Sequence, residues 1–213
     1  MSESKIGGLL VSAGLSSRMG NFKPLMEYNG ETYVIGITRK LIQVCSKVVI
    51  VTGFQKEKVE STINSQSAFG GQVLNLPTGR QGSQLGKVVS CVNNPDYEKG
   101  MFTSLQTGAK CLKDCDWVLY HFVDQPFHKE KFYEELILQA DDNYNWIQPV
   151  YNNKEGHPIM FNKRVIELIL YGSQNATLRL IGDLPAIKKK YWNCSYPNIL
   201  KDYDTPDDIS KSF

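Results

Sequence analysis

The chain has 213 residues, of which 41% are hydrophobic and 22% are charged, and its formal net charge is +2. This length suffices for one buried core, so we expect a single domain over residues 1–213. The net charge argues neither for nor against a nucleic-acid partner, but no Lys/Arg run resembles a polybasic tail, so no nucleic-acid partner is expected. The apolar run in the N-terminal segment is too short for a signal peptide or a membrane span. We therefore expect no membrane contact. The five cysteines form no C-x-x-C framework, so we expect a cytoplasmic protein with free thiols.

Apolar runs and amphipathic stretches alternate along the chain. The pattern predicts strands at 6–12, 48–53 and 117–124, helices at 33–45, 55–63, 101–112, 129–140 and 163–171, and short extended pieces at 146–150 and 158–161. Such alternation predicts an α/β fold with a mostly parallel sheet and helices on both faces. Ligands bind beyond the carboxyl ends of parallel strands, so residues 13–20 and 124–126 are expected at one edge.

Residues 65–87 break this rhythm. The segment is rich in Gly, Gln and Ser and shows no sustained period, so it is interpreted as a loop insertion at the surface, with a short strand at 73–76. Its TGRQGSQLGK stretch lacks the Gly-Lys-Ser/Thr of a phosphate-binding P-loop.

The stretch VSAGLSSRMGNFKPL, residues 11–25, follows the first predicted strand with small residues and two cations. Small residues allow a close backbone approach to an anion, which Arg18 can grip in a bidentate way and Lys23 can neutralise. The spacing differs from the G-x-G-x-x-G of a dinucleotide-binding loop. The alternative is an ordinary glycine turn with surface cations.

Six segments, in order, resemble the molybdenum cofactor cytidylyltransferase-like nucleotidyltransferases. They are VSAGLSSRMGNFKPL, VVIVTGF (48–54), NPDYEKGMFTSLQTGAK (94–110), FVDQPF (122–127), EGHPIMF (155–161) and KDYDTPDDI (201–209). The resemblance implies a three-layer Rossmann-like domain related to the glycosyltransferase-A fold. It also implies transfer of a nucleoside monophosphate to a phosphorylated acceptor with release of pyrophosphate.

The resemblance carries over a nucleotide site and three catalytic residues. The catalytic residues are Arg18, Lys23 and Asp124. The nucleotide-binding residues are Ser12, Ala13, Gly14, Leu15, Ser16, Ser17, Arg18, Lys23, Gly53, Asn94, Gly100 and Ser104. Ser104 is alternatively a small polar residue required at a helix N-terminus.

Mg²⁺ is the implied cofactor. Asp124 ends a strongly apolar strand, where a carboxylate is costly without a partner such as a metal. The alternative role for Asp124 is to cap the helix at 129–140. Asp202 and Asp204 lie two residues apart before a Thr-Pro helix start, so one can complete the metal site and the other can cap. The sequence does not distinguish them.

The implied acceptor-binding residues are Gln125, Pro126, Gly156, His157 and Pro158. His157 either orients the phosphate of the acceptor or is a surface histidine. His121, within an apolar strand, is expected to be a satisfied core residue.

The leading assignment is cytidylyl transfer from CTP to molybdopterin. Ala13 favours CTP, because A-A-G accompanies the CTP enzymes of this family and A-G-G the guanylyl ones. One alternative acceptor is a sugar or polyol phosphate. Another alternative is a non-catalytic accessory protein that delivers the cofactor to a molybdenum hydroxylase partner, although such a carrier would not need Arg18, Lys23 and Asp124.

Overall fold

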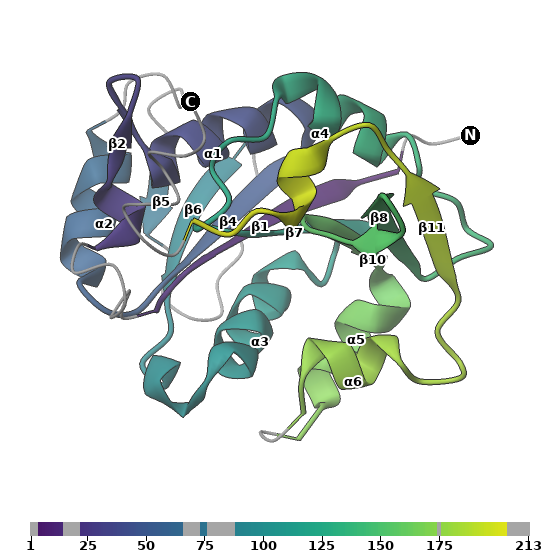
Figure 1. Cartoon of the computed structure of the whole chain (residues 1–213). Coiled ribbons are helices and arrows are strands. Elements are labelled where there is room, and N and C mark those ends of the chain that lie inside the picture. The colour runs from purple at the N-terminus through teal and green to yellow at the C-terminus, as the bar shows by residue number, and fades with distance from the viewer. Residues whose placement is uncertain (1–3, 15–21, 66–72, 76–87, 174–175, 204–213) are drawn as a thin grey trace.

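The fold is that of a computed structural model of the chain, which describes residues 4–14, 22–65, 73–75, 88–173 and 176–203. In these ranges a twisted sheet of nine strands forms the middle layer. Helices cover both of its faces (Figure 1). The expected α/β fold with a mostly parallel central sheet is therefore confirmed.

Four apolar strands form the centre of the sheet: β1 (Ile6–Ser12), β4 (Lys47–Thr52), β6 (Val88–Asn93) and β7 (Trp117–Phe122). All four run parallel, with β1 between β4 and β7, and with β6 beside β4. Their nearly continuous burial is typical of strands covered on both faces. Val11 lies opposite both Val51 and Phe122, so β1, β4 and β7 end at the same edge.

The remaining strands extend the sheet on both sides. β5 (Val73–Asn75) adds a parallel edge strand to β6. On the other side, β10 (Ile159–Asn162) runs antiparallel between β7 and β8 (Trp146–Tyr151), and β11 (Lys189–Asn193) runs parallel to β8. The short β9 (Lys154–Glu155) also pairs with β8. The strand order is β11-β8-β10-β7-β1-β4-β6-β5.

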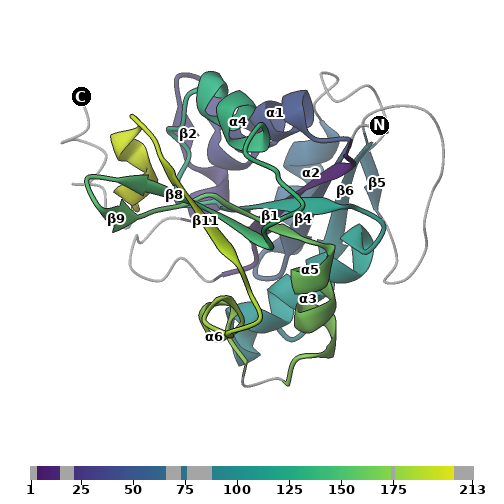
Figure 2. The ribbon, with the colours of Figure 1, turned by 90° about the vertical axis from the view of Figure 1, so that its right-hand side faces the viewer.

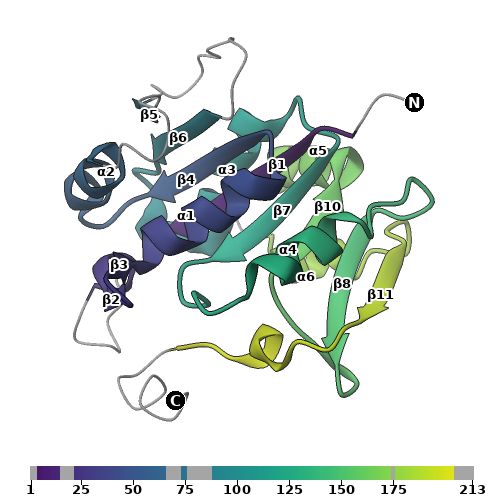
Figure 3. The ribbon, with the colours of Figure 1, turned by 90° about the horizontal axis from the view of Figure 1, so that it is seen from above.

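Six helices form the outer layers of the described structure. α1 (Tyr33–Val44), α2 (Lys56–Asn64) and α4 (Glu130–Ile137) contribute to one apolar cluster, and Figure 3 shows α1 and α4 lying across that face. α3 (Met101–Leu112), α5 (Lys163–Tyr171) and α6 (Leu178–Gly182) contribute to a second cluster on the opposite face. Figure 2 shows α6 below β11.

Short elements connect these layers. The hairpin of β2 (Glu27–Tyr28) and β3 (Glu31–Thr32) turns at Asn29 and Gly30, whose φ angles of 52° and 79° are those of a type I′ turn. The 3₁₀ turns are η1 (Lys23–Leu25), η3 (Tyr97–Lys99) and η4 (Pro197–Leu200).

Most of the predicted elements are present, with ends shifted by a few residues. The strand predicted at 117–124 ends at Phe122, and the helix predicted at 129–140 ends at Ile137. The sequence pattern did not identify β6, β11, α6 or the β2–β3 hairpin. Of the expected insertion, 66–72 and 76–87 lie outside the described residues, whereas Val73–Asn75 forms the short strand that was expected near 73–76.

Helix α3 approaches β1 so closely that Gly108 has no room for a side chain. A Cβ atom at Gly108 would lie 2.2 Å from Leu9 Cδ1 and 3.0 Å from Val51 Cγ2. Leu9 and Val51 are fully buried, so neither can move into solvent. The glycine therefore sets the distance between α3 and the sheet.

We expect Gly108→Ala to lower the free energy of unfolding by about 1–3 kcal/mol, because overpacking outweighs the better helix propensity of alanine. Urea denaturation measures this change. Gly36→Ala in α1 is the matched control, since its Cβ would meet only the end of the Glu31 side chain at 3.0 Å. Equal effects of the two substitutions would contradict the packing argument.

Candidate active site

The ends of β1 and β4 meet in a close backbone contact. Phe54 N–H donates to the carbonyl of Ala13 (3.2 Å), and Ala13 itself is buried. A Cβ at Gly53 would lie 2.8 Å from both Ala13 O and Tyr97 Cγ. Glycine is therefore needed at position 53 for this approach.

Only the first part of the expected phosphate loop is described. Gly14 has open space where a Cβ would lie, which suits a backbone approached by a ligand. Ser12 is buried, and its hydroxyl has no hydrogen-bond partner among the described residues. Leu15, Ser16, Ser17 and Arg18 lie outside the described residues, so their predicted roles stay predictions.

Lys23 and Asp124 come together at this edge. Lys23 begins η1, Asp124 follows β7, and the distance from Lys23 Nζ to Asp124 Oδ2 is 3.7 Å. The lysine side chain is only 9% exposed, against 31% for the aspartate. A buried ammonium requires a nearby negative charge, and the Asp124 carboxylate supplies it. Asp124 does not cap α4, because that helix begins at Glu130 with Lys129 as its N-cap.

The segment that follows η4 brings Asp202 to the same loop. Tyr203 N–H donates to the carbonyl of Asp124 (3.0 Å), and Gln125 Nε2 donates to Asp202 Oδ1 (2.7 Å). Carboxylates on two adjacent segments fit Mg²⁺, which prefers oxygen ligands. Asp204 lies outside the described residues, and the described residues alone contain no cluster of three His, Cys, Asp or Glu side chains able to hold a metal.

Gly156 and His157 hold that segment from the other side. His157 N–H donates to the carbonyl of Ile199 (2.9 Å). A Cβ at Gly156 would lie 2.4 Å from Ile199 O, so this glycine also permits a close backbone contact. Pro158 directly precedes β10, and Pro126 is buried in the loop after Asp124.

A buried polar cluster supports the start of α3. Asn94 Nδ2 donates to Ser104 Oγ (2.8 Å) and to Thr103 Oγ1 (2.9 Å), and Asn94 Oδ1 accepts from Asp96 N–H (3.0 Å). Both Asn94 and Ser104 are 2% exposed. These contacts shape the loop that ends at Gly100, where φ is 114° and a Cβ would meet open space.

A cavity of about 930 Å³ is lined by residues of α3, β7, β8, α6 and β11. Its aromatic lining is Phe102, Tyr120, Phe122, Trp146 and Tyr191, and its polar lining includes Gln148, His157, Arg179, Asp183 and Lys189. Gly100 and Met101 border it as well. Sequence reasoning placed Gly100 and His157 near substrate but missed Trp146 and Gln148, whose two-residue spacing in β8 was the available signal.

His157 faces this cavity and lies against Phe122, with 4.9 Å between the ring centroids. Its Nδ1 atom is buried and has no hydrogen-bond partner among the described residues. Burial lowers the pKa of His157 to about 4, with Asp202 opposing the shift. The imidazole is therefore neutral at pH 7, and its Nδ1 atom can form one hydrogen bond with a ligand.

His121 is the satisfied core residue that was expected. It is fully buried, its Nε2 lies 2.8 Å from the Tyr133 hydroxyl, and its Nδ1 lies 2.7 Å from the carbonyl of Phe122.

The sheet order and the convergent strand ends are those of a Rossmann-like α/β domain. The chain belongs to the family of the MobA-like NTP transferase domain, whose model matches residues 8–184. This confirms the family resemblance and the expectation of an enzyme. No helix among the described residues is long and apolar enough to cross a membrane.

Relatives and a solved structure agree with this class. The chain is 24% identical to the molybdenum cofactor cytidylyltransferase of Escherichia coli K12, over 97% of this chain and 94% of that protein. It is also 24% identical to a probable molybdenum cofactor guanylyltransferase of Bacillus cereus Q1, over 85% and 80% of the two chains. A nucleotidyl transferase structure from Methanothermobacter matches with a TM-score of 0.71 at 17% identity, covering 99% and 96%, which shows the fold alone.

The buried histidines predict a loss of stability in acid. Burial lowers the pKa of His157 to about 4 and that of His121 to about 3, whereas the unfolded value is about 6.5. Below about pH 6.5 the unfolded chain therefore binds more protons than the folded one. The resulting stability is complete above this pH and is lost progressively toward pH 4.

We expect the free energy of unfolding to fall by about 1–2 kcal/mol per buried histidine between pH 7 and pH 5. Urea denaturation across this range measures it. His157→Gln should reduce this pH dependence of the free energy of unfolding by the contribution of one histidine. An unchanged slope in this variant would show that His157 is protonated as readily in the folded state as in the unfolded one.

Proposed function

We propose that the protein transfers CMP from CTP to the phosphate of molybdopterin and releases pyrophosphate. The observation that carries the proposal is the Lys23–Asp124 pair, which lies where β1 and β7 end together. The family membership supports nucleotidyl transfer. The similarity to a cytidylyltransferase and to a guanylyltransferase of the molybdenum cofactor supports the acceptor class.

The chain's own residues would align the reactants. An oxygen of the acceptor phosphate attacks the α-phosphorus of the nucleotide, the bond to the bridging oxygen breaks, and pyrophosphate leaves with the electron pair. Lys23 and Arg18 would neutralise phosphate oxygens, with Arg18 as a bidentate clamp. Asp124 and one of Asp202 and Asp204 would hold Mg²⁺, which when bound neutralises charge on the phosphates.

Gln125 has a positioning role in this proposal. Its Nε2 hydrogen bond to Asp202 holds the two acidic segments together. If Asp124 held a cation, Lys23 could turn to a phosphate, so the pair at 3.7 Å would serve as a resting arrangement. Pairing also limits the cost of burying Lys23 before substrate arrives.

The nucleotide would lie on the backbone between Ala13 and Gly14 and beside the loop before α3. Asn94 and Ser104 would act by fixing that loop, because their side chains are buried and bonded to each other. Gly100 would then present backbone groups to the base. Ala13 is the feature that would favour a pyrimidine, because its side chain would take up room that a purine needs.

The cavity of about 930 Å³ is the proposed acceptor site. Trp146 and Phe122 suit a flat heteroaromatic ring, and Gln148 and His157 lie beside them. Lys189 and Arg179 supply positive charge, although both also contact Asp183, at 3.2 Å and 3.9 Å. The product of the transfer, molybdopterin linked to CMP, would be delivered to a molybdenum hydroxylase partner.

Asp124→Asn should lower kcat by at least roughly a hundredfold, as expected for loss of a main charge-stabilising group. Pyrophosphate release with CTP, Mg²⁺ and molybdopterin measures this change. The matched control is Asp142→Asn, which changes an exposed carboxylate between α4 and β8 and should leave kcat unchanged. Turnover of Asp124→Asn within a few-fold of the unsubstituted protein would remove Asp124 from the metal site.

CTP should be preferred over GTP by at least about a hundredfold in kcat/KM, which corresponds to about 2.7 kcal/mol. Ala13→Gly should reduce this preference, because it opens space for a purine. Steady-state kinetics with each nucleotide decide the matter. Equal use of GTP would end the cytidylyl assignment, and binding of molybdopterin without any turnover would favour the accessory-protein alternative.

A further inference from the structure

A second cavity, here called the Lys40 cavity, lies behind the loop that carries Asp124. Its volume is about 340 Å³, and its lining residues are Tyr28, Lys40, Pro126, Phe127, His128, Asn198, Lys201 and Tyr203. It shares no lining residue with the cavity of about 930 Å³. Lys40 comes from α1, so the cavity belongs to the α1/α4 side of the sheet.

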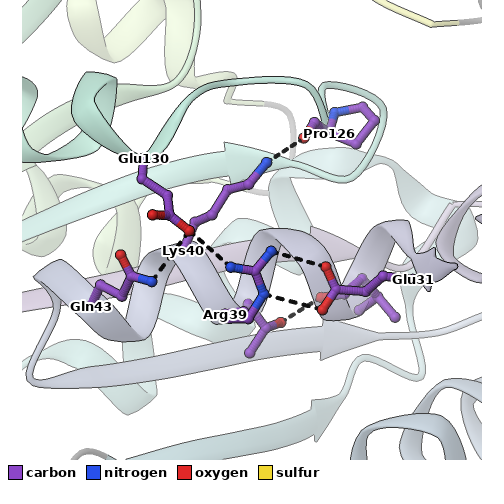
Figure 4. A network of polar contacts seen from close by, with 8 residues as sticks. Glu31, Arg39, Lys40, Gln43, Pro126 and Glu130 are labelled. Atoms are coloured by element: carbon purple, nitrogen blue, oxygen red, sulfur yellow. Dashed lines mark hydrogen bonds and ion pairs between the residues drawn. The ribbon is translucent and has the colours of Figure 1, made fainter. Parts of the chain in front are cut away.

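The lining is basic. Lys40 and Lys201 contribute two ammonium groups, and no described Asp or Glu lines the cavity. The acidic groups that act on Lys40 are Glu31 and Glu130. Both are bonded to Arg39 instead: Arg39 Nη2 and Nε donate to the two oxygens of Glu31 (3.1 and 3.2 Å), and Nη1 donates to Glu130 Oε1 (2.8 Å). Figure 4 shows this network beside Lys40.

Lys40 itself donates to a carbonyl rather than to a carboxylate. Its Nζ lies 2.8 Å from the oxygen of Pro126 (Figure 4). Burial, and to a lesser extent the neighbouring Arg39, lowers the pKa of Lys40 to about 8. A partly buried ammonium without a hydrogen-bonded carboxylate among the described residues is a group that an anion would stabilise.

His128 provides a second, independent observation. It is only 3% exposed, and neither ring nitrogen has a hydrogen-bond partner among the described residues. The ring is held in place by stacking on Phe132 (4.9 Å between centroids) and by an edge contact with His121 (5.5 Å). Buried polar atoms without partners are rare in folded proteins, and an anion in the Lys40 cavity would accept from the protonated nitrogen.

We propose that the Lys40 cavity is a binding site for a small phosphate-type oxyanion, distinct from the nucleotide site. Lys40, Lys201 and His128 would supply the donors. Asn198 Nδ2 already donates to the carbonyl of Phe127 (2.8 Å), which leaves its second N–H for the ligand. The inference concerns binding alone and does not rest on the proposed function.

The three histidines of the chain make a site-specific test possible. Inorganic phosphate is titrated into ¹³C-histidine-labelled protein at constant pH and without Mg²⁺, and the imidazole signals are followed by NMR. His128→Gln identifies the His128 signal. We expect this signal to shift to saturation, whereas a phosphate bound near Lys23 would leave it in place. Titrations with pyrophosphate and with sulfate show whether the cavity binds phosphate groups in particular or oxyanions in general.

Lys40→Met should weaken the phosphate-dependent shift of His128 at least about tenfold, because a charged hydrogen bond is lost. Lys201→Met removes an exposed charge and should weaken the phosphate-dependent shift of His128 less than Lys40→Met does. This second variant keeps the test decisive if Lys40→Met does not fold. Lys190→Met is the matched control, since Lys190 also donates to a carbonyl, that of Gln139 (3.1 Å), but lines neither cavity. Any of three results would overturn the proposal. The His128 signal could stay fixed during the phosphate titration, or it could respond equally to sodium chloride at matched ionic strength. It could also shift to the same extent in Lys40→Met and in Lys201→Met as in the unsubstituted protein.

Discussion

The parallel pairing of β1 with β7 is the constraint on which the candidate site depends. It brings the end of an apolar strand and its glycine turn next to the loop that begins at Asp124. Lys23 then enters from η1 and pairs with Asp124 at 3.7 Å. A slip of one residue would turn every side chain to the opposite face of the sheet, and the two faces pack into different apolar clusters. The register is therefore strongly fixed, and with it the relative position of the two charges.

Backbone contacts from the far end of the chain complete this edge. The segment from Ile199 to Tyr203 bonds to His157 on one side and to Asp124 on the other. Gly156 allows the close approach to Ile199. Through Gln125, Asp202 is then held beside the loop of Asp124. The hydrogen bond between Gln125 and Asp202 joins residues 77 positions apart, which explains how distant segments of the chain can serve one site.

The sequence predicted the elements that carry strong periodicity. Runs such as residues 6–12 and 117–122 are apolar enough to be recognised as buried strands. β6 was not recognised, because Ser90 interrupts its apolar run and the strand directly follows the Gly-rich segment. β11, with the sequence KKYWN, has the polar composition of an exposed edge. The cavity residues Trp146 and Gln148 meet α3 and α6 only through tertiary packing, which a local pattern does not contain. His128 was missed for the same reason.

The most direct test of the account is to identify the product of the reaction. Purified protein is incubated with Mg²⁺, CTP and molybdopterin, and the mixture is examined by ³¹P NMR and mass spectrometry. The account predicts one pyrophosphate for each molybdopterin–cytidine dinucleotide, with neither product formed when Mg²⁺ or the acceptor is omitted. Release of inorganic phosphate in place of pyrophosphate, or no covalent product while both substrates are bound, would contradict nucleotidyl transfer at the Lys23–Asp124 site.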